Sequence, residues 1–282
     1  MLLNMDQIYL NGSFLPRSEA QIPIMDRGFL FGDGVYELIP VFNKKVFLLE
    51  EHLKRLKNSL NLIQMNDIKG LDKIISTLIK KNTKNTFFIY LHITRGVQSS
   101  RNHIYSENIE PTILLMCEDY PSFSKNEIKQ GFQATIQNDF RWMKSNIKSI
   151  SLLGNVLLKN YASNNECYET LLIRDNRLTE GSTSNVFIVK DEIIYTPKLS
   201  NELLPGVTRG LLIKLLGQNN LKVIESDISQ SDLINADEVW CSSSTNSVVP
   251  IIKVDNSIIN DGKTGKISIK IYEITQDFIS DF

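Results

Sequence analysis

Lys148 lies at a point in the sequence where its side chain could do covalent chemistry. It has Ile147 and Ser149 as neighbours, and it stands where a polar linker gives way to a helix-like segment at 150–167. Burial there would disfavour the ammonium form and leave an amine that can attack a carbonyl or hold an aldehyde as a Schiff base. Most lysines, however, lie at the surface with only their stems packed. The local sequence therefore leaves both interpretations open.

Two downstream segments add an acid and an anion site in chain order. Glu180 belongs to the run Thr179–Asn185, which joins two strand-like stretches, and Leu204–Arg209 opens a helix. Free N–H groups and the dipole at a helix N-terminus suit a phosphate, so Val207 and Thr208 are candidate donors. Taken alone, Glu180 is more often an acid that caps a turn or a helix. A lysine, a carboxylate and a helix N-terminus thus follow one another along the chain.

Together with the glycine-rich run Asp26–Glu37, these segments resemble the fold-type IV pyridoxal-phosphate enzymes, which include branched-chain and D-amino acid aminotransferases and aminodeoxychorismate lyase. The resemblance begins near Ile8 and extends to the C-terminal helix. It implies an α+β protein with a smaller N-terminal and a larger C-terminal α/β domain, with the cofactor between them, in a homodimer. It also singles out Lys148 as the Schiff-base lysine and Glu180 as the partner of the pyridine nitrogen, which a carboxylate keeps protonated.

The resemblance implies two further side chains in the phosphate site. Arg55 matches the family's helical arginine, and Ser244 in the run Ser242–Thr245 stands where the family has a threonine, a departure that retains a hydroxyl donor. By themselves, Arg55 is more often a solvated helix residue and the serine run a polar turn. The residues expected to bind pyridoxal 5′-phosphate are therefore Arg55, Lys148, Glu180, Val207, Thr208 and Ser244.

Tyr36, Arg101 and His103 form a candidate trap for the α-carboxylate of an amino acid. A guanidinium can hold a carboxylate through two parallel hydrogen bonds, and a tyrosine hydroxyl and an imidazole can add donors. Without the resemblance, Arg101 and His103 would indicate only a solvated, basic loop. The runs Thr94–Gly96 and Arg101–His103 resemble the D-amino acid aminotransferase branch, in which the arginine and the histidine reach across from the partner subunit.

The substrates that this branch implies are D-alanine and 2-oxoglutarate, converted to pyruvate and D-glutamate. Three alternatives stay open. A branched-chain L-amino acid aminotransferase or an aminodeoxychorismate lyase would share the fold, and the lyase would not need Arg101 and His103. A non-catalytic cofactor carrier or interaction protein built on this fold is the third, although intact Lys148, Glu180 and Thr208 argue against it.

Hydrophobic spacing predicts the elements that position these residues. Asn11-Gly12 between apolar runs indicates a tight hairpin, and a second hairpin is expected about residues 43–45. Apolar residues three and four apart predict helices at 50–63, 71–81, 150–166, 206–219 and 264–279. Apolar runs predict strands at 22–25, 86–95, 111–117, 132–137, 168–174, 186–189, 193–196, 222–225, 238–242 and 248–254.

Two connections stand out between these elements. The polar loop 96–110 is long for a compact domain, which makes it either mobile or functional. Proline and serine at 119–124 mark the expected boundary between domains 1–120 and 121–282. The glycines at 28, 32 and 34 do not follow the G-x-G-x-x-G order, so a dinucleotide fold is not expected.

Composition and charge give no sign of a nucleic-acid or membrane partner, and the small-molecule partners are what the resemblance implies. The chain has 282 residues, 42% of them hydrophobic, enough for one large or two medium domains. A net charge of −1 without long runs of one sign gives no attraction for nucleic acid or an anionic membrane. Three distant cysteines and three histidines lack metal-ligand spacing. The segment Met1–Gln7 lacks the features of a signal peptide, and no apolar run suggests a membrane span, so we expect a cytoplasmic protein.

Overall fold

The computed structural model describes residues 7–282, and the chain divides into two compact units. The first comprises Met1–Tyr120 and Ile147–Leu152, and the second comprises Pro121–Asn146 and Leu153–Phe282. The expected division into 1–120 and 121–282 differs from this one at 147–152, because that segment is hydrogen-bonded to a strand of the first unit. Residues 1–6, on which the expectation of no signal peptide rests, lie outside the described residues.

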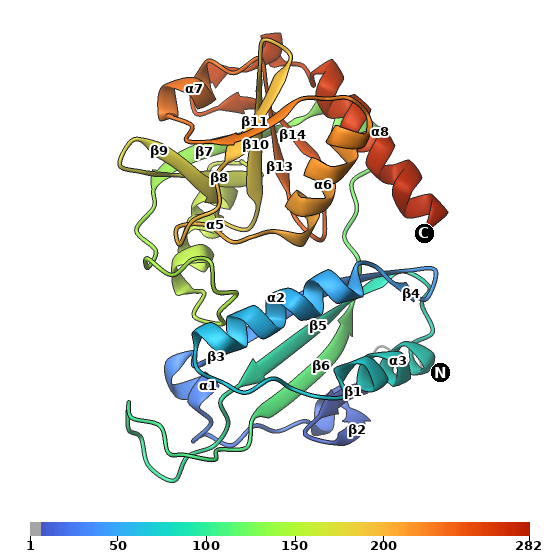
Figure 1. The fold of residues 1–282 in the computed structure, drawn as a ribbon, viewed down its shortest axis with the longest axis vertical. Helices are drawn as coiled ribbons and strands as arrows, with labels where there is room; N and C mark the ends of the chain where they lie inside the picture. The colour runs from blue at the N-terminus through green and yellow to red at the C-terminus, as the bar shows by residue number, and fades with distance from the viewer. Residues whose placement is uncertain (1–6) are drawn as a thin grey trace. The chain divides into compact units, whose positions relative to one another are not determined.

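The described part of the first unit contains a six-stranded antiparallel sheet in the order β2-β1-β6-β5-β3-β4 (Figure 1). Helix α2 contacts β3, and α3 contacts β1 and β6, so that one hydrophobic core lies between the helices and the sheet. The elements are β1 Gln7–Leu10, β2 Ser13–Pro16, η1 Arg17–Glu19, α1 Arg27–Phe31, β3 Gly34–Phe42, β4 Lys45–Val46, α2 Leu49–Leu62, α3 Leu71–Lys81, β5 Phe87–Thr94 and β6 Thr112–Glu118.

Side-chain periodicity explains how this unit packs. On α2, Leu56 and Leu60 are buried at four-residue spacing, as the apolar stripe predicts. On β3, alternate residues face the core, where Val35, Ile39 and Val41 are fully buried, while Tyr36 lies on the other face and is partly exposed. Glu37 has the parity of the core residues, which makes it a carboxylate inside an apolar face.

The second unit, all of whose residues are described, is built on a nine-stranded mixed sheet in the order β12-β11-β10-β13-β14-β7-β8-β9, with β15 paired to β14. The pairs β7–β8, β7–β14 and β11–β12 are parallel. Its elements are α4 Lys125–Gln130, β7 Phe132–Asn138, α5 Leu153–Asn164, β8 Glu169–Arg174, β9 Arg177–Gly181, β10 Asn185–Lys190, β11 Ile193–Pro197, α6 Val207–Gln218, β12 Val223–Ser226, α7 Gln230–Ile234, β13 Glu238–Ser242, β14 Val249–Val254, β15 Ser257–Ile258, η2 Asn260–Gly262 and α8 Lys266–Asp281.

Most predicted elements are present, but the short helices α1, α4 and α7 were not predicted, and three expectations differ locally from the structure. The strand expected at 22–25 is wrong, since Ile24 and Met25 form a turn that leads into α1. The helix expected from residue 150 begins at Leu153, because residues before it pair with β3 instead. Glu180 was placed in a connection, but it lies on β9, which forms a hairpin with β8 through Asp175 and Asn176 in the left-handed region.

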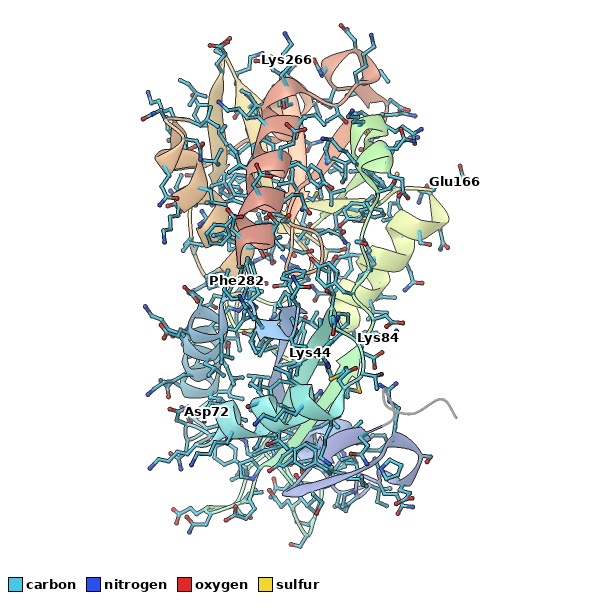
Figure 2. All side chains as sticks on the ribbon, turned by 90° about the vertical axis from the view of Figure 1, so that its right-hand side faces the viewer. Lys44, Asp72, Lys84, Glu166, Lys266 and Phe282 are labelled. Atoms are coloured by element: carbon cyan, nitrogen blue, oxygen red, sulfur yellow. The ribbon has the colours of Figure 1, made fainter. Side chains whose placement is uncertain are left out.

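Many charged residues lie at the surface, for example Asp72, Glu166 and Lys266, which are exposed (Figure 2). Within residues 7–282, no helix has both the length and the apolar character needed to cross a membrane.

Candidate active site

The backbone of Lys148 is hydrogen-bonded to β3 in the first unit. The Tyr36 N–H donates to the Lys148 carbonyl oxygen at 3.0 Å, and Val35 forms a bridge with Ser149. The Lys148 N–H donates to the Ser59 hydroxyl of α2 at 3.2 Å. The lysine backbone is thus fixed by a strand and a helix at once. Its Nζ lies 4.1 Å from the centroid of the Tyr36 ring, so two of the predicted site residues are brought together.

Arg55 is buried against Glu37 and is not the solvated helix residue that its sequence alone would suggest. Its Nε donates to Glu37 Oε1 at 2.8 Å and its Nη2 to Oε2 at 2.7 Å, a two-pronged ion pair. His52 Nδ1 lies 2.8 Å from the same Oε2. Glu37 and His52 were not predicted as functional. The available signal was an acid at a core position of β3, next to Tyr36.

The charge states of Glu37, Arg55 and His52 follow from their surroundings. Burial alone would raise the pKa of Glu37, but the charge and hydrogen bonds of Arg55, together with the hydrogen bond from His52, lower it to about 2. Burial is also the main cause that lowers the pKa of His52 below 6.5, against the opposing effect of Glu37. At neutral pH, Glu37 is therefore a buried anion, Arg55 a buried cation and His52 a neutral imidazole.

Acid is expected to destabilise the first unit through Glu37. Because the pKa of Glu37 is about 2 in the fold and ordinarily 4.5, the unfolded chain binds more protons between these values. The stability that ionised Glu37 contributes is complete above pH 4.5 and is lost as the pH falls toward 2. The lowered pKa of His52 acts in the same direction below pH 6.5. Urea unfolding as a function of pH measures this loss.

The Glu37→Gln variant provides the comparison. It should lower the free energy of unfolding at pH 7 by about 3–5 kcal/mol, because Arg55 would remain buried without its counter-charge. It should also flatten the acid dependence below pH 4.5, whereas Glu118→Gln, at a more exposed ion pair of the same unit, should keep it. A wild-type acid dependence in Glu37→Gln would contradict the assignment.

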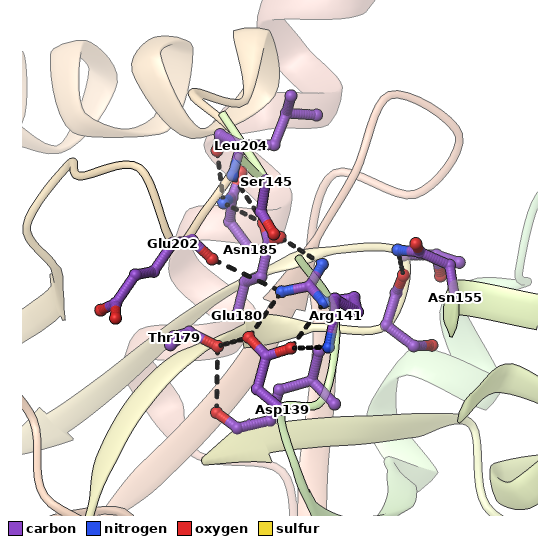
Figure 3. A network of polar contacts seen from close by, with 12 residues as sticks. Asp139, Arg141, Ser145, Asn155, Thr179, Glu180, Asn185, Glu202 and Leu204 are labelled. Carbon is purple, nitrogen blue, oxygen red and sulfur yellow. Dashed lines mark hydrogen bonds and ion pairs between the residues drawn. The ribbon is translucent and has the colours of Figure 1, made fainter. Parts of the chain in front are cut away.

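Glu180 is a buried acid of the second unit (Figure 3). Its Oε1 accepts from Arg141 Nη1 at 2.7 Å, and its Oε2 accepts from the Leu204 N–H at 2.9 Å. Arg141 also pairs with Asp139 at 2.9 Å, so its charge is shared between two acids. Burial raises the pKa of Glu180 to about 7, although Arg141 lowers it. A cationic partner in contact with Glu180 would therefore be favourable.

Asn185 joins the surroundings of Glu180 to the start of α6. Its Nδ2 donates to the Leu204 carbonyl oxygen at 2.9 Å. A Cβ on Gly206 would lie 2.0 Å from Asn185 Oδ1, so a residue without a side chain is required for this close approach. Asn185 also pairs with Ser242 across β10 and β13. Sequence reasoning assigned no role to Asn185 or to Arg141.

The donors around the start of α6 fit an anion. Gly206 is the N-cap, no side chain caps the helix, and Val207 and Thr208 are buried in its first turn. The hydroxyl oxygen of buried Ser242 has no hydrogen-bond partner within residues 7–282. Ser244 lies in the adjoining turn, which the Ser243 N–H closes on the Asn246 carbonyl oxygen at 2.9 Å. Backbone N–H groups and hydroxyls in this arrangement suit a phosphate.

Arg101 and His103 lie in the loop between β5 and β6 of the first unit, and both side chains are exposed. The Arg101 Cζ lies 5.0 Å from the centroid of the Phe31 ring, and the His103 ring centroid lies 5.1 Å from it. Of the predicted trap, Tyr36 thus lies beside Lys148, and Arg101 and His103 lie against Phe31. Of the predicted residues, Lys148, Tyr36, Arg55, Arg101 and His103 belong to the first unit, and Glu180, Val207, Thr208 and Ser244 to the second.

Comparisons with known proteins agree on the family. Residues 34–254 match the amino-transferase class IV family. The chain is 38% identical over 279 residues to the D-alanine aminotransferase of Staphylococcus aureus (strain N315), covering 98% of both chains. It is 35% identical over 272 residues to the D-alanine aminotransferase of Listeria monocytogenes serotype 1/2a (strain 10403S), covering 95% of this chain and 94% of that one.

Solved structures show the same fold at lower identity. The branched-chain aminotransferase of Thermoproteus uzoniensis with norvaline superposes with a TM-score of 0.86 at 22% identity, over 97% of this chain and 94% of that chain. The Escherichia coli branched-chain amino acid aminotransferase gives 0.85 at 23% identity, over 98% and 93%. The expected α+β, fold-type IV architecture is confirmed. Family match, full-length relatives and shared fold together show that this chain belongs to the class IV aminotransferases.

Proposed function

We propose that this chain is a D-amino acid aminotransferase that transfers the amino group of D-alanine to 2-oxoglutarate with pyridoxal 5′-phosphate as cofactor. Relatives named D-alanine aminotransferase match nearly the whole chain, which supports the substrate class. The observation that carries the D-specific part is the joint placement of Arg101 and His103 against the ring of Phe31. A guanidinium and an imidazole held in this way can donate several hydrogen bonds to one α-carboxylate.

The donors and acids of the chain suit the chemical groups of the cofactor. When bound, pyridoxal phosphate supplies an electron-withdrawing ring that weakens the Cα–H bond of an amino acid. Lys148 would hold the aldehyde through Nζ and then, as a free amine, move the Cα proton. Glu180 would keep a proton on the ring nitrogen, and its raised pKa favours such a cationic partner. Val207, Thr208, Ser244 and Arg55 would hold the phosphate.

Thr208→Val is expected to weaken cofactor retention more than it alters chemistry. It removes a hydroxyl donor at the start of α6, and a hydrogen bond to a charged group contributes about 1.5–3 kcal/mol, or roughly ten- to a hundredfold in the dissociation constant. Equilibrium dialysis against free cofactor measures the change. Thr264→Val is the matched control, since its hydroxyl donates to the Ile128 carbonyl oxygen of the same unit, outside the candidate site. Equal retention in both variants would place the phosphate elsewhere.

The same proposal includes a homodimer in which Arg101 and His103 complete the partner's site. On α5, Leu153, Val156, Leu157 and Tyr161 form one apolar face and are 73%, 50%, 55% and 41% exposed. In the first unit, Ile24, Phe29 and Ile104 are 75%, 73% and 78% exposed. Large exposed apolar side chains gathered on one helix face are usually covered in an assembly, and a second copy is the partner that we infer. The free thiols of Cys117, Cys167 and Cys241 agree with the cytoplasmic location that we propose.

The direct test compares the enantiomers of alanine, glutamate and leucine as amino donors to 2-oxo acids. Turnover of D-alanine should far exceed that of L-alanine, with the protein sedimenting as a dimer. Arg101→Ala should raise KM for D-alanine by on the order of a hundredfold, since a bond to a charged group is lost, with cofactor binding unaltered. A preference for L-leucine or L-glutamate, or normal D-alanine kinetics in Arg101→Ala, would favour the branched-chain activity instead. Absence of any turnover despite bound cofactor would favour a non-catalytic carrier.

A further inference from the structure

A buried arginine, Arg27 at the start of α1, holds the backbone of the loop that carries Arg101 and His103. Its Nη1 donates to the Asn102 carbonyl oxygen at 2.6 Å, and its Nη2 donates to the His103 carbonyl oxygen at 3.1 Å. The side chain is only 4% exposed, so these bonds are shielded from water. Two consecutive carbonyls of the loop are thereby tied to one planar guanidinium.

Gln98 adds a second link between Arg27 and the same loop. Its Oε1 accepts from Arg27 Nη1 at 3.3 Å and from the Ser106 N–H at 3.3 Å. Its Nε2 donates to the Ile104 carbonyl oxygen at 3.2 Å. Within the described residues, the loop is therefore held at 102, 103, 104 and 106. The exposed part of this loop is thus held by a buried polar anchor, the side chains of Arg27 and Gln98.

Arg27 is itself held in place by charge. Its Nε donates to Asp33 Oδ2 at 2.8 Å, and Arg95 donates to the same oxygen at 2.8 Å and to Oδ1 at 3.0 Å. Arg95 also stacks on Tyr105 of the loop, with its Cζ 3.9 Å from the ring centroid. Burial would raise the pKa of Asp33, but the two arginines lower it, so the acid stays ionised between them. The anchor is a compact set of paired charges.

Phe31 connects the anchor to the two donors. The Cζ of Arg27 lies 4.9 Å from the centroid of its ring, and the Cζ of Arg101 lies 5.0 Å from it. The His103 ring lies 5.1 Å away at an angle of 40°. One aromatic ring therefore carries the anchoring arginine and both candidate carboxylate donors. The backbone bonds and the ring together restrict the directions in which Arg101 and His103 can point.

We propose that Arg27 is a positioning residue for substrate binding, which fixes the loop so that Arg101 and His103 are preorganised to receive an α-carboxylate. The inference rests on the proposed function of those two residues. Arg27 itself is buried under the loop and acts through them. Donors that are already oriented lose less entropy when they bind, and small displacements of a binding group can cost a hundredfold in rate.

Arg27→Met tests the proposal, because methionine keeps an unbranched, apolar stem and removes every donor. The KM for D-alanine and for the 2-oxo acid should each rise roughly ten- to a hundredfold, while kcat changes little. Arg27→Lys should give a smaller rise, since an ammonium cannot reproduce the planar fork. Arg17→Met, at an arginine that pairs with Glu118 in the same unit, serves as control and should leave KM unchanged.

Two further measurements separate positioning from a general structural role. The half-reaction with a primary amine that lacks a carboxylate should be unaffected by Arg27→Met, because the trap has nothing to hold. Hydrogen exchange of the Ile104 and Ser106 amides, which are bonded to Asn102 Oδ1 and Gln98 Oε1, should become faster. In an Arg101→Ala, His103→Ala background, Arg27→Met should raise KM no further, because Arg27 is proposed to act on substrate binding only through these two residues.

The outcomes distinguish this inference from the proposed function. A raised KM in Arg101→Ala together with wild-type KM in Arg27→Met would overturn the positioning role alone. Wild-type KM in both variants would remove the proposed trap itself. If Arg27→Met does not fold, Arg27→Lys becomes the deciding variant, since an ammonium keeps a charge for Asp33 but cannot reproduce the planar fork that bonds the Asn102 and His103 carbonyl oxygens. A wild-type KM for D-alanine and a wild-type exchange rate in Arg27→Lys would then refute the proposal.

Discussion

Lys148→Ala is expected to lower transamination by on the order of 10⁴-fold, because one side chain is proposed both to hold the cofactor and to move the Cα proton. The variant should lose its activity and the visible absorption of the bound cofactor together. Purified wild-type protein should be yellow, since the protonated lysine–cofactor linkage absorbs in the visible, and the variant should lose this absorption. Single-turnover kinetics with D-alanine measures the loss of rate.

Borohydride reduction gives the chemical proof for Lys148. In the wild-type protein it should fix the cofactor to the peptide that contains Lys148, which mass spectrometry of a digest identifies. Lys144→Ala is the matched control, because this nearby lysine is exposed, and it should keep both colour and activity. Cofactor fixed to another lysine would overturn the assignment.

Glu180→Gln is expected to slow removal of the Cα proton roughly 10²-fold, the size typical of losing one electrostatic partner of a reacting group. A neutral amide cannot hold the ring nitrogen in its protonated form. The fold should survive, because Arg141 keeps Asp139 as its partner at 2.9 Å and the amide oxygen can still accept from the Leu204 N–H. Stopped-flow kinetics with Cα-deuterated and ordinary D-alanine isolates this step.

Several comparisons make this result specific. Cofactor should remain bound in Glu180→Gln, and Glu180→Asp should be less impaired because it keeps a carboxylate. Glu225→Gln, which removes the partner of Arg209 elsewhere in the second unit, should react normally. A wild-type rate of proton removal in Glu180→Gln would make Glu180 a structural residue.

Helices and hairpins with strong local signals could be predicted from the sequence. The helix predicted at 71–81 has those bounds, and the one predicted at 50–63 runs from Leu49 to Leu62. The Asn11-Gly12 hairpin is confirmed, with both residues at positive φ. These elements are set by side-chain spacing and turn chemistry over a few residues, so the local sequence is sufficient.

Short elements were missed even where a signal existed. Helices α4 and α7 have six and five residues, too few for a periodic apolar stripe. Each begins with a capping box, from Ser124 to Glu127 and from Ser229 to Asp232, which a search for helix starts would have found. Strand β9 was missed because Arg177–Gly181 lacks an apolar run, although it is buried by its neighbours.

The sequence by itself determined the family pattern, the core helices and the types of residue available for chemistry. Only the tertiary structure decided their neighbours. It paired Lys148 with β3, buried Arg55 on Glu37, and joined Arg27 to carbonyls 75 and 76 residues away. Such contacts depend on chain segments that meet only after the sheets form, and on burial that makes ion pairs and hydrogen bonds obligatory. Local composition carries no record of them.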